Sequence, residues 1–169
     1  GGLKYGDSWF AGLAAEKDTG RILQKIDELE KEADLATLPA EAKATLAERL
    51  GFVALAGRGQ DHAVLAQAVL AHDRLALARD GFDWDQAADS LFGRNTFLET
   101  LKHIPARHSE ALLEFMLKRN PQVAESLMLE VLPELDTSAY GRIVETFVRH
   151  GKAEACGGRI GSVVAQRAA

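Results

Sequence analysis

Helical periodicity runs through almost the whole chain and limits its fold more than any other feature of the sequence. Apolar residues recur every three or four positions, as in the stripe of Ile22, Ile26 and Leu29. The strict alternation of apolar and polar residues that indicates a β-strand is almost absent. Ala and Leu are abundant, while aromatic residues make up only 7% of the chain, and this mixture favours helix over sheet. We therefore predict an all-α fold.

Capping and stop residues divide this pattern into about nine or ten short helices joined by short loops. Asn120 followed by Pro121 is a strong start signal, because it combines a capping side chain with a first-turn proline. The predicted helices cover residues 9–18, 21–36, 40–50, 61–79, 84–91, 96–104, 110–118, 121–132 and 138–150, and a further helix begins at Lys152. The expected architecture is a multi-helix bundle or a helical solenoid.

Single residues are expected to set several of these helix boundaries. Gly51 can end the helix over residues 40–50. Ser109 can cap the helix over 110–118, and Thr137 or Ser138 can cap the helix over 138–150. The helix over 110–118 has almost no polar face, so we expect it to be central and buried.

The chain of 169 residues is expected to fold as one helical domain over residues 1–169. The best candidate for an internal boundary is residues 93–95, where the composition changes from Ala/Asp-rich to Leu/Phe-rich. Gly1 and Gly2 are interpreted as a cloning remnant because no initiator Met precedes them. We therefore expect the chain to be part of a longer protein.

The composition is that of an ordinary globular protein, with 47% hydrophobic and 27% charged residues. The single cysteine, Cys156, excludes an internal disulfide framework and fits a reducing compartment, so we expect a cytoplasmic location. No apolar run approaches the roughly 18 residues needed to span a bilayer. We therefore expect no membrane partner.

Charge is distributed unevenly along the chain, whose net charge is −5. Residues 1–101 carry 11 Lys or Arg and 17 Asp or Glu, whereas residues 137–169 carry 5 basic and 2 acidic side chains. An acidic body does not match the strongly basic footprint of a nucleic-acid-binding protein. The basic C-terminal part could still contact phosphate. Its basic residues are Arg142, Arg149, Lys152, Arg159 and Arg167.

Gly-Arg dipeptides recur at residues 20–21, 57–58 and 93–94, with spacings typical of one helical hairpin in a solenoid. Residues 138–166 also resemble one unit of the tetratricopeptide or pentatricopeptide repeat superfamily. The matching positions are Tyr140, Ile143, Phe147, Gly151 and Ala155. This resemblance implies a helical hairpin, with peptide or single-stranded RNA bound on a concave face. The acidic body favours the peptide.

The histidines suggest metal chemistry only in isolated pairs. His72-Asp73 is similar to the tandem found in helical metal-dependent phosphohydrolases, but that site needs ligands from other helices, and the only earlier histidine is His62. Glu99 and His103 lie one helical turn apart without the second Glu-x-x-His motif of a di-iron bundle. We interpret His72-Asp73 as a solvent-facing pair and expect no metal site, cofactor or catalytic residue.

The absence of a convergent catalytic set, together with the helical pattern, favours a non-enzymatic adaptor or scaffold domain that binds a protein or peptide. The candidate contact residues are the aromatic side chains Trp9, Phe10 and Trp84, which are either binding hot spots or core residues. Two alternatives remain open. One is a nucleic-acid accessory module that uses the basic C-terminal residues, and the other is a helical metal-dependent hydrolase.

Overall fold

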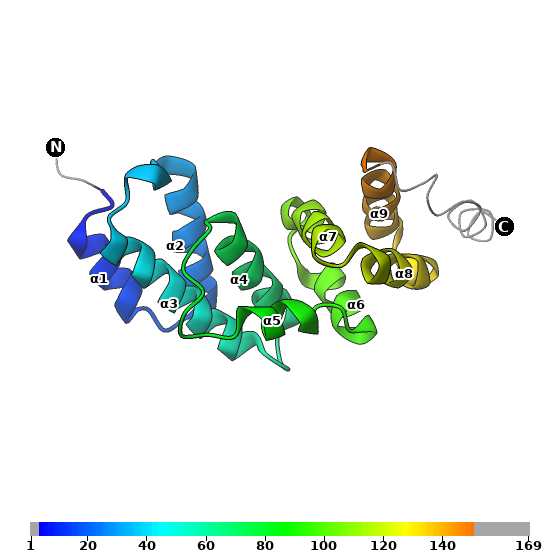
Figure 1. The fold of residues 1–169 in the computed structure, drawn as a ribbon, viewed down its shortest axis with the longest axis horizontal. Coiled ribbons are helices and arrows are strands. Elements are labelled where there is room, and N and C mark those ends of the chain that lie inside the picture. Colours follow the sequence, from blue (N-terminus) through cyan, green and yellow to red (C-terminus); the bar gives the residue numbers. More distant parts are fainter. Residues whose placement is uncertain (1–3, 151–169) are drawn as a thin grey trace. The chain divides into compact units, whose positions relative to one another are not determined.

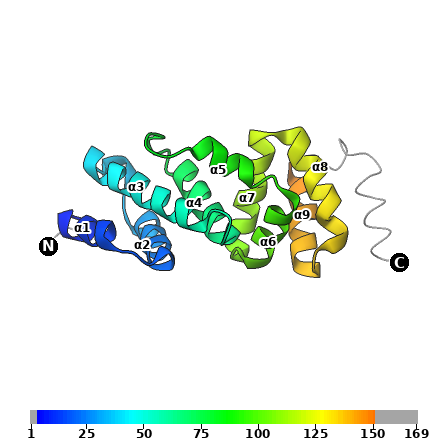
Figure 2. The same cartoon turned by 90° about the horizontal axis from the view of Figure 1, so that it is seen from below.

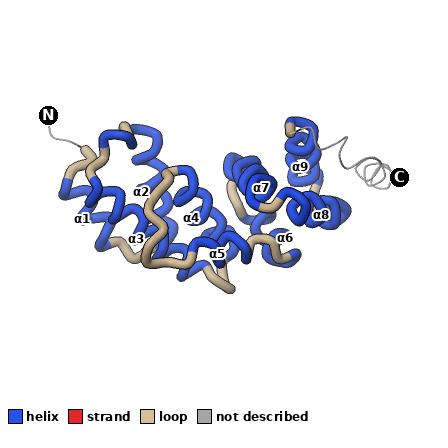
Figure 3. The backbone as a smooth tube through the Cα atoms, viewed as in Figure 1, coloured by secondary structure: helices blue, strands red, loops and turns tan. Residues whose placement is uncertain are grey.

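The structure, a computed structural model, describes residues 4–150, and every regular element in that range is helical (Figures 1 and 3). This confirms the predicted all-α fold. The α-helices of the described part are α1 (Asp7–Ala15), α2 (Thr19–Glu32), α3 (Ala40–Gly57), α4 (His62–Arg74), α5 (Trp84–Ser90), α6 (Arg94–His103), α7 (Ala106–Arg119), α8 (Pro121–Val131) and α9 (Thr137–Arg149). Short 3-10 turns occupy Leu35–Thr37 and Leu132–Glu134.

Several predictions fall on residues outside the described range. They are the helix expected from Lys152, the thiol of Cys156 and the two N-terminal glycines. Within the described range, none of the helices combines the length and the apolar character that crossing a membrane requires.

The helices pack as two compact units, which divide between Asp89 and Ser90. This division lies a few residues before the boundary proposed at residues 93–95. The first unit contains α1 to α4 and nearly all of α5, and the second contains α6 to α9.

Helix α3 is the centre of the first unit, where it contacts α1, α2 and α4 (Figures 1 and 2). Its side chains Leu46, Leu50 and Val53 are fully buried. They form a stripe at the helical spacing, so one face of α3 is packed along most of its length. Each fully buried Leu or Val side chain contributes about 1.5–3 kcal/mol to this packing.

The expectation that Gly51 ends the third helix is wrong, because α3 continues through Gly51 to Gly57. The apolar stripe does not stop at Gly51, since Val53 and Ala54 are also fully buried. Glycine inside a helix costs about 1 kcal/mol relative to alanine. The burial of the next turn outweighs that cost, and the helix ends only where Gly57 lies against α4.

The two glycines of α3 differ in the space around them. A Cβ added at Gly57 would lie 2.8 Å from the backbone nitrogen of Leu65, whereas a Cβ added at Gly51 would make ordinary contacts with Phe82, the nearest at 3.6 Å. Backbone atoms of α4 cannot move away without disturbing its first turn. The close approach of α3 to α4 therefore requires glycine at 57 but not at 51.

We expect Gly51→Ala to raise the free energy of unfolding by about 1 kcal/mol, because alanine loses less conformational entropy in a helix. Gly57→Ala should lower it by about 1–3 kcal/mol, because the new methyl group overpacks the contact with α4. Urea denaturation of the two variants measures both changes. Equal effects of the two substitutions would contradict this description of the contact.

Helix α4 ends at Arg74, earlier than the predicted end at residue 79. The chain turns there because Ala76 adopts a left-handed conformation with a φ of 51°. The N–H of Ala76 donates to the carbonyl of Asp73 at 3.0 Å, and the N–H of Leu77 donates to the carbonyl of His72 at 3.4 Å. This is the Schellman pattern, with alanine at the position where glycine is usual. Burial of Leu77 accompanies the turn.

The left-handed conformation is about 1 kcal/mol less favourable for alanine than for glycine. We therefore expect Ala76→Gly to raise the free energy of unfolding by about 0.5–1 kcal/mol, measured by urea denaturation. Ala78→Gly is the matched control in the same loop. Ala78 does not have a positive φ, so glycine there should lower stability or leave it unchanged. A free energy of unfolding lower in Ala76→Gly than in the wild type would contradict this explanation.

Helix α7 is the centre of the second unit, where it contacts α8 and α9. Its Leu112, Leu113 and Met116 are fully buried, as expected for a central helix. The expectation that it has almost no polar face is wrong, because Glu110 and Lys118 are exposed. The expected cap at Ser109 is wrong. Helix α7 already begins at Ala106, after Pro105, and Ser109 is a fully buried residue within it.

Two helix starts in the second unit depend on side-chain caps. Asn120 caps α8 as predicted, and its Oδ1 accepts a hydrogen bond from the N–H of Val123 at 3.4 Å. Helix α9 is capped by Asp136 rather than by Thr137 or Ser138, and Asp136 Oδ1 accepts from the N–H of Ala139 at 2.8 Å. Asp and Ser are comparable capping residues, so propensity alone did not separate them.

Candidate functional site

A pocket of about 410 Å³ lies between α1 and the N-terminal part of α3 in the first unit. The lining is mostly apolar or small, with a few polar side chains. It consists of Tyr5, Gly6, Asp7, Phe10, Ala11, Ala14, Pro39, Glu41, Ala42 and Thr45. We take this pocket as the candidate binding site of the described residues, and it contains one of the predicted contact residues, Phe10.

The pocket exists because α1 is held at both ends while small residues face the space between. At the C-terminal end of α1, the Nη1 group of Arg49 on α3 donates to the carbonyl oxygen of Glu16 at 2.7 Å. The guanidinium also lies 4.6 Å from the ring centre of Phe52, a cation–π contact. The alanine side chains Ala11 and Ala14 on α1 are too small to close the gap to α3.

At the other end of α1, Tyr5 is tied to α2. Its hydroxyl donates to the carboxylate of Glu32, which also accepts from Lys4 Nζ at 2.6 Å. The hydrogen bonds from Lys4 and Tyr5 lower the pKa of Glu32, so the carboxylate stays charged. The side chain of Tyr5 is therefore a fixed part of the pocket wall.

An aromatic cluster borders the pocket. Trp9 contacts Tyr5 on one side and Phe10 on the other, with ring centres 4.9 Å apart and an interplanar angle of 81° in both pairs. Phe10 is buried, at 9% exposure, whereas Trp9 is half-buried. The cluster extends the apolar lining to the surface, where Tyr and Trp are the commonest hot-spot residues of protein interfaces.

The polar rim of the pocket is acidic. Asp7 and Glu41 lie in the first turns of α1 and α3, and both are exposed. Within residues 4–150 the carboxylates of both residues form no ion pair or hydrogen bond. The two helix N-termini contribute only about half a positive charge each, so two full negative charges leave the rim negative.

Trp84, the third predicted aromatic contact, lies apart from Trp9 and Phe10. It begins α5, is only 3% exposed and stacks on His72 with ring centres 3.8 Å apart and an interplanar angle of 15°. Its place is in the core of the first unit. Of the three aromatic side chains, Phe10 lines the pocket and Trp9 contacts Phe10.

The interpretation of His72-Asp73 as a solvent-facing pair is wrong for the histidine. His72 is 3% exposed, and its Nε2 lies 2.9 Å from the carbonyl oxygen of Ala78, to which it donates. Burial lowers the pKa of His72, so the ring is neutral. The imidazole holds the loop after α4 in place. Among the described residues, no three His, Cys, Asp or Glu side chains are grouped closely enough to hold a metal ion.

The lowered pKa of His72 makes stability depend on pH. The unfolded chain, whose histidine has the usual pKa of 6.5, binds the proton more readily than the folded chain. The contribution of His72 is therefore fully present above about pH 6.5 and is lost as the pH falls below it. We expect wild-type stability to fall between about pH 7.5 and about pH 5.5, and to fall less in His72→Gln. Urea denaturation across that range measures both, and equal slopes would contradict a neutral, buried His72.

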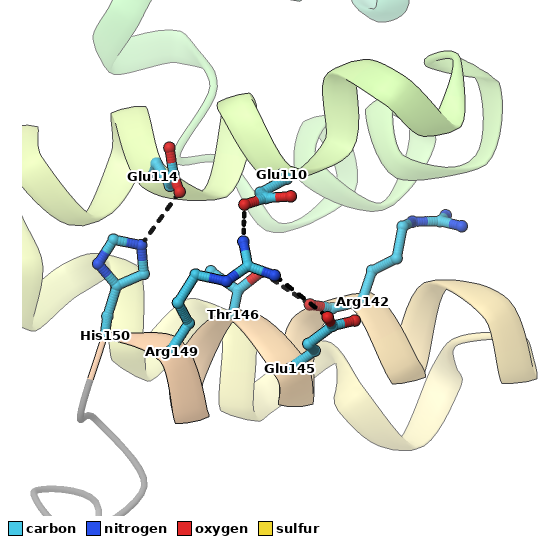
Figure 4. Close-up of polar contacts among 7 residues, drawn as sticks. All are labelled: Glu110, Glu114, Arg142, Glu145, Thr146, Arg149 and His150. Atoms are coloured by element: carbon cyan, nitrogen blue, oxygen red, sulfur yellow. Dashed lines mark hydrogen bonds and ion pairs between the residues drawn. The ribbon is translucent and has the colours of Figure 1, made fainter.

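Two of the predicted phosphate contacts lie on α9, and α7 provides an acidic neighbour for one of them, Arg149 (Figure 4). Arg149 pairs with Glu110 of α7 and, at 3.1 Å, with Glu145. Arg142 donates to the hydroxyl of Ser138 at 2.6 Å. Phosphate would have to displace carboxylates to reach Arg149. The other three predicted contacts, at positions 152, 159 and 167, lie outside the described residues.

His150 extends this polar row at the end of α9. Its Nε2 lies 3.4 Å from the carboxylate of Glu114 on α7 (Figure 4). The contacts on this side of α7 thus join α7 to the end of α9 through one ion pair, Arg149 with Glu110, and one polar contact, His150 with Glu114. They account for Arg149 and His150 as helix-packing contacts within the second unit.

Sequence reasoning missed Tyr5, Asp7 and Glu41 as pocket residues. From the sequence, Asp7 could be identified only as a residue at a helix start, and Glu41 only as an acidic side chain in the first turn of a helix. Their shared position depends on α1 packing against α3, and the intervening α2 separates these helices in the sequence. The apolar periodicity of one helix does not indicate which other helix it packs against.

No protein-family model matches the sequence, and no curated protein or solved structure matches it. The resemblance of residues 138–166 to one tetratricopeptide or pentatricopeptide unit stays a prediction. Helix α9 occupies the first half of that segment, and the second half lies outside the described residues.

Proposed function

We propose that this chain is a non-enzymatic interaction module whose pocket between α1 and α3 receives an apolar side chain of a peptide or protein partner. The observation that carries the proposal is the pocket itself, bordered by the half-buried Trp9. Its volume of about 410 Å³ falls in the range of about 300–1,000 Å³ that binding pockets occupy. It also exceeds the roughly 150 Å³ that accommodates a benzene ring.

The chemistry of the lining supports binding rather than catalysis. The lining contains no His, Cys, Ser or Lys side chain, so a Ser–His or Cys–His pair of nucleophile and base cannot be formed from it. The hydroxyl of Thr45 donates to the carbonyl of Glu41 at 3.1 Å within α3. A small molecule would also need several convergent hydrogen-bond donors for its orientation. An aromatic border beside an apolar pocket instead suits an extended partner surface.

A substitution on α1 that blocks the pocket tests this function. A displayed library of random peptides is first selected on the wild-type chain, and the affinities of the enriched peptides are then measured by fluorescence anisotropy. Ala11 is exposed and lines the pocket. We expect Ala11→Trp to weaken binding at least about tenfold, a change of about 1.4 kcal/mol, because the indole occupies the space of the ligand side chain.

Ala44→Trp is the matched control, since Ala44 is exposed on α3 and does not line the pocket. It should leave the affinity near that of the wild type. Circular dichroism of both variants confirms that the helices remain folded. Peptides that bind both variants as tightly as the wild type would remove the pocket as the site of interaction.

A further inference from the structure

We propose that the segment bound in this pocket is basic: a short peptide that inserts an apolar side chain between α1 and α3 and places a Lys or Arg beside it, against Asp7 and Glu41. This inference rests on the proposed function and names the chemistry of the partner. The docking surface is the pocket described above, together with its two rim carboxylates.

Within residues 4–150, no Lys or Arg side chain pairs with the two rim carboxylates. Some other carboxylates of the first unit do have a cationic partner. Glu30 of α2 accepts two hydrogen bonds from Arg74, and Asp27 pairs with Lys31 at 3.1 Å. The pocket lining, by contrast, contains two acidic residues and no Lys or Arg.

The shape of a basic side chain matches this pocket. Lys and Arg have apolar stems that pack on hydrophobic surface while the charged end stays in water. Exposed carboxylates beside small apolar side chains in one lining fit both parts. The stem can lie on Ala11, Ala14 and Ala42, and the cation can reach Asp7 or Glu41 at the solvent boundary. An acidic partner would meet two like charges at the same place.

The first unit as a whole is acidic. Residues 1–89 carry 10 Lys or Arg and 16 Asp or Glu, for a net charge of −6. The field of such a unit attracts a basic segment during diffusion and raises its association rate at low salt. The pocket then supplies the apolar contact that determines where the segment docks.

The peptide library selected on the full wild-type chain tests the inference in two ways. One is the composition of the enriched peptides, and the other is the change in their affinity when the rim charges are removed. We expect the enriched peptides to contain an apolar residue with Lys or Arg close to it. The double variant Asp7→Asn/Glu41→Gln should bind them roughly tenfold more weakly at low salt, in line with two lost charge contacts. Added salt, to about 0.5 M, should weaken wild-type binding and reduce this difference.

The double variant Glu48→Gln/Asp80→Asn is the matched control, because it removes the same charge at exposed positions away from the pocket. Equal losses in both double variants would overturn the inference and indicate only a general acidic field. Enriched peptides without excess Lys or Arg, still blocked by Ala11→Trp, would overturn it while leaving the proposed function intact. Insensitivity to Ala11→Trp would overturn both.

The other occupant to be tested is a second copy of this chain, which must be distinguished from a foreign peptide. Sedimentation velocity of the wild-type chain and of Ala11→Trp is expected to show the same species for both. A wild-type dimer that Ala11→Trp converts to monomer would assign the pocket to a second copy of this chain, and would overturn the inference of a basic peptide.

Discussion

The packing of α3 against its three neighbours is the interaction on which the first unit depends. Leu46, Leu50 and Val53 bury one face of α3, and Gly57 brings its end within contact of the backbone of α4. The position of α1, the course of α2 and the start of α4 are all defined relative to this helix. A helix that holds three others must be long, and α3 continues through Gly51 because the packing outweighs the local propensity.

The candidate site is a by-product of this arrangement. Helix α1 is short and is attached at its ends, by the hydrogen bond of Arg49 to Glu16 and by the bond of Tyr5 to Glu32. Between those attachments, alanine side chains leave a volume that no residue of α1 or α3 fills. Most of the lining residues are exposed or half-buried, so the pocket is open to solvent. A partner side chain that enters it removes apolar surface from water, which gives the pocket a physical reason to bind.

The aromatic residues of the first unit illustrate how the same residue type serves two purposes. Trp84 stacks on His72 inside the unit, and the two rings fix the loop between α4 and α5. Trp9 makes edge contacts with Tyr5 and Phe10 and remains half-buried beside the pocket. In sequence both are single tryptophans near a helix start. Only their neighbours in space separate a core residue from a candidate contact residue.

The sequence by itself determined the all-α class, most of the helices and the cap at Asn120, because periodicity and capping are local properties. It also identified Trp9 and Phe10 as candidate contacts. Only the tertiary structure decided that α3 runs past Gly51, that His72 is buried and that Asp7 and Glu41 share one pocket with Phe10. Each of these depends on contacts between helices distant in sequence. The sequence of a single helix does not indicate which neighbour covers its apolar face. The pocket depends on the packing of α1 against α3, so the sequence alone did not predict it.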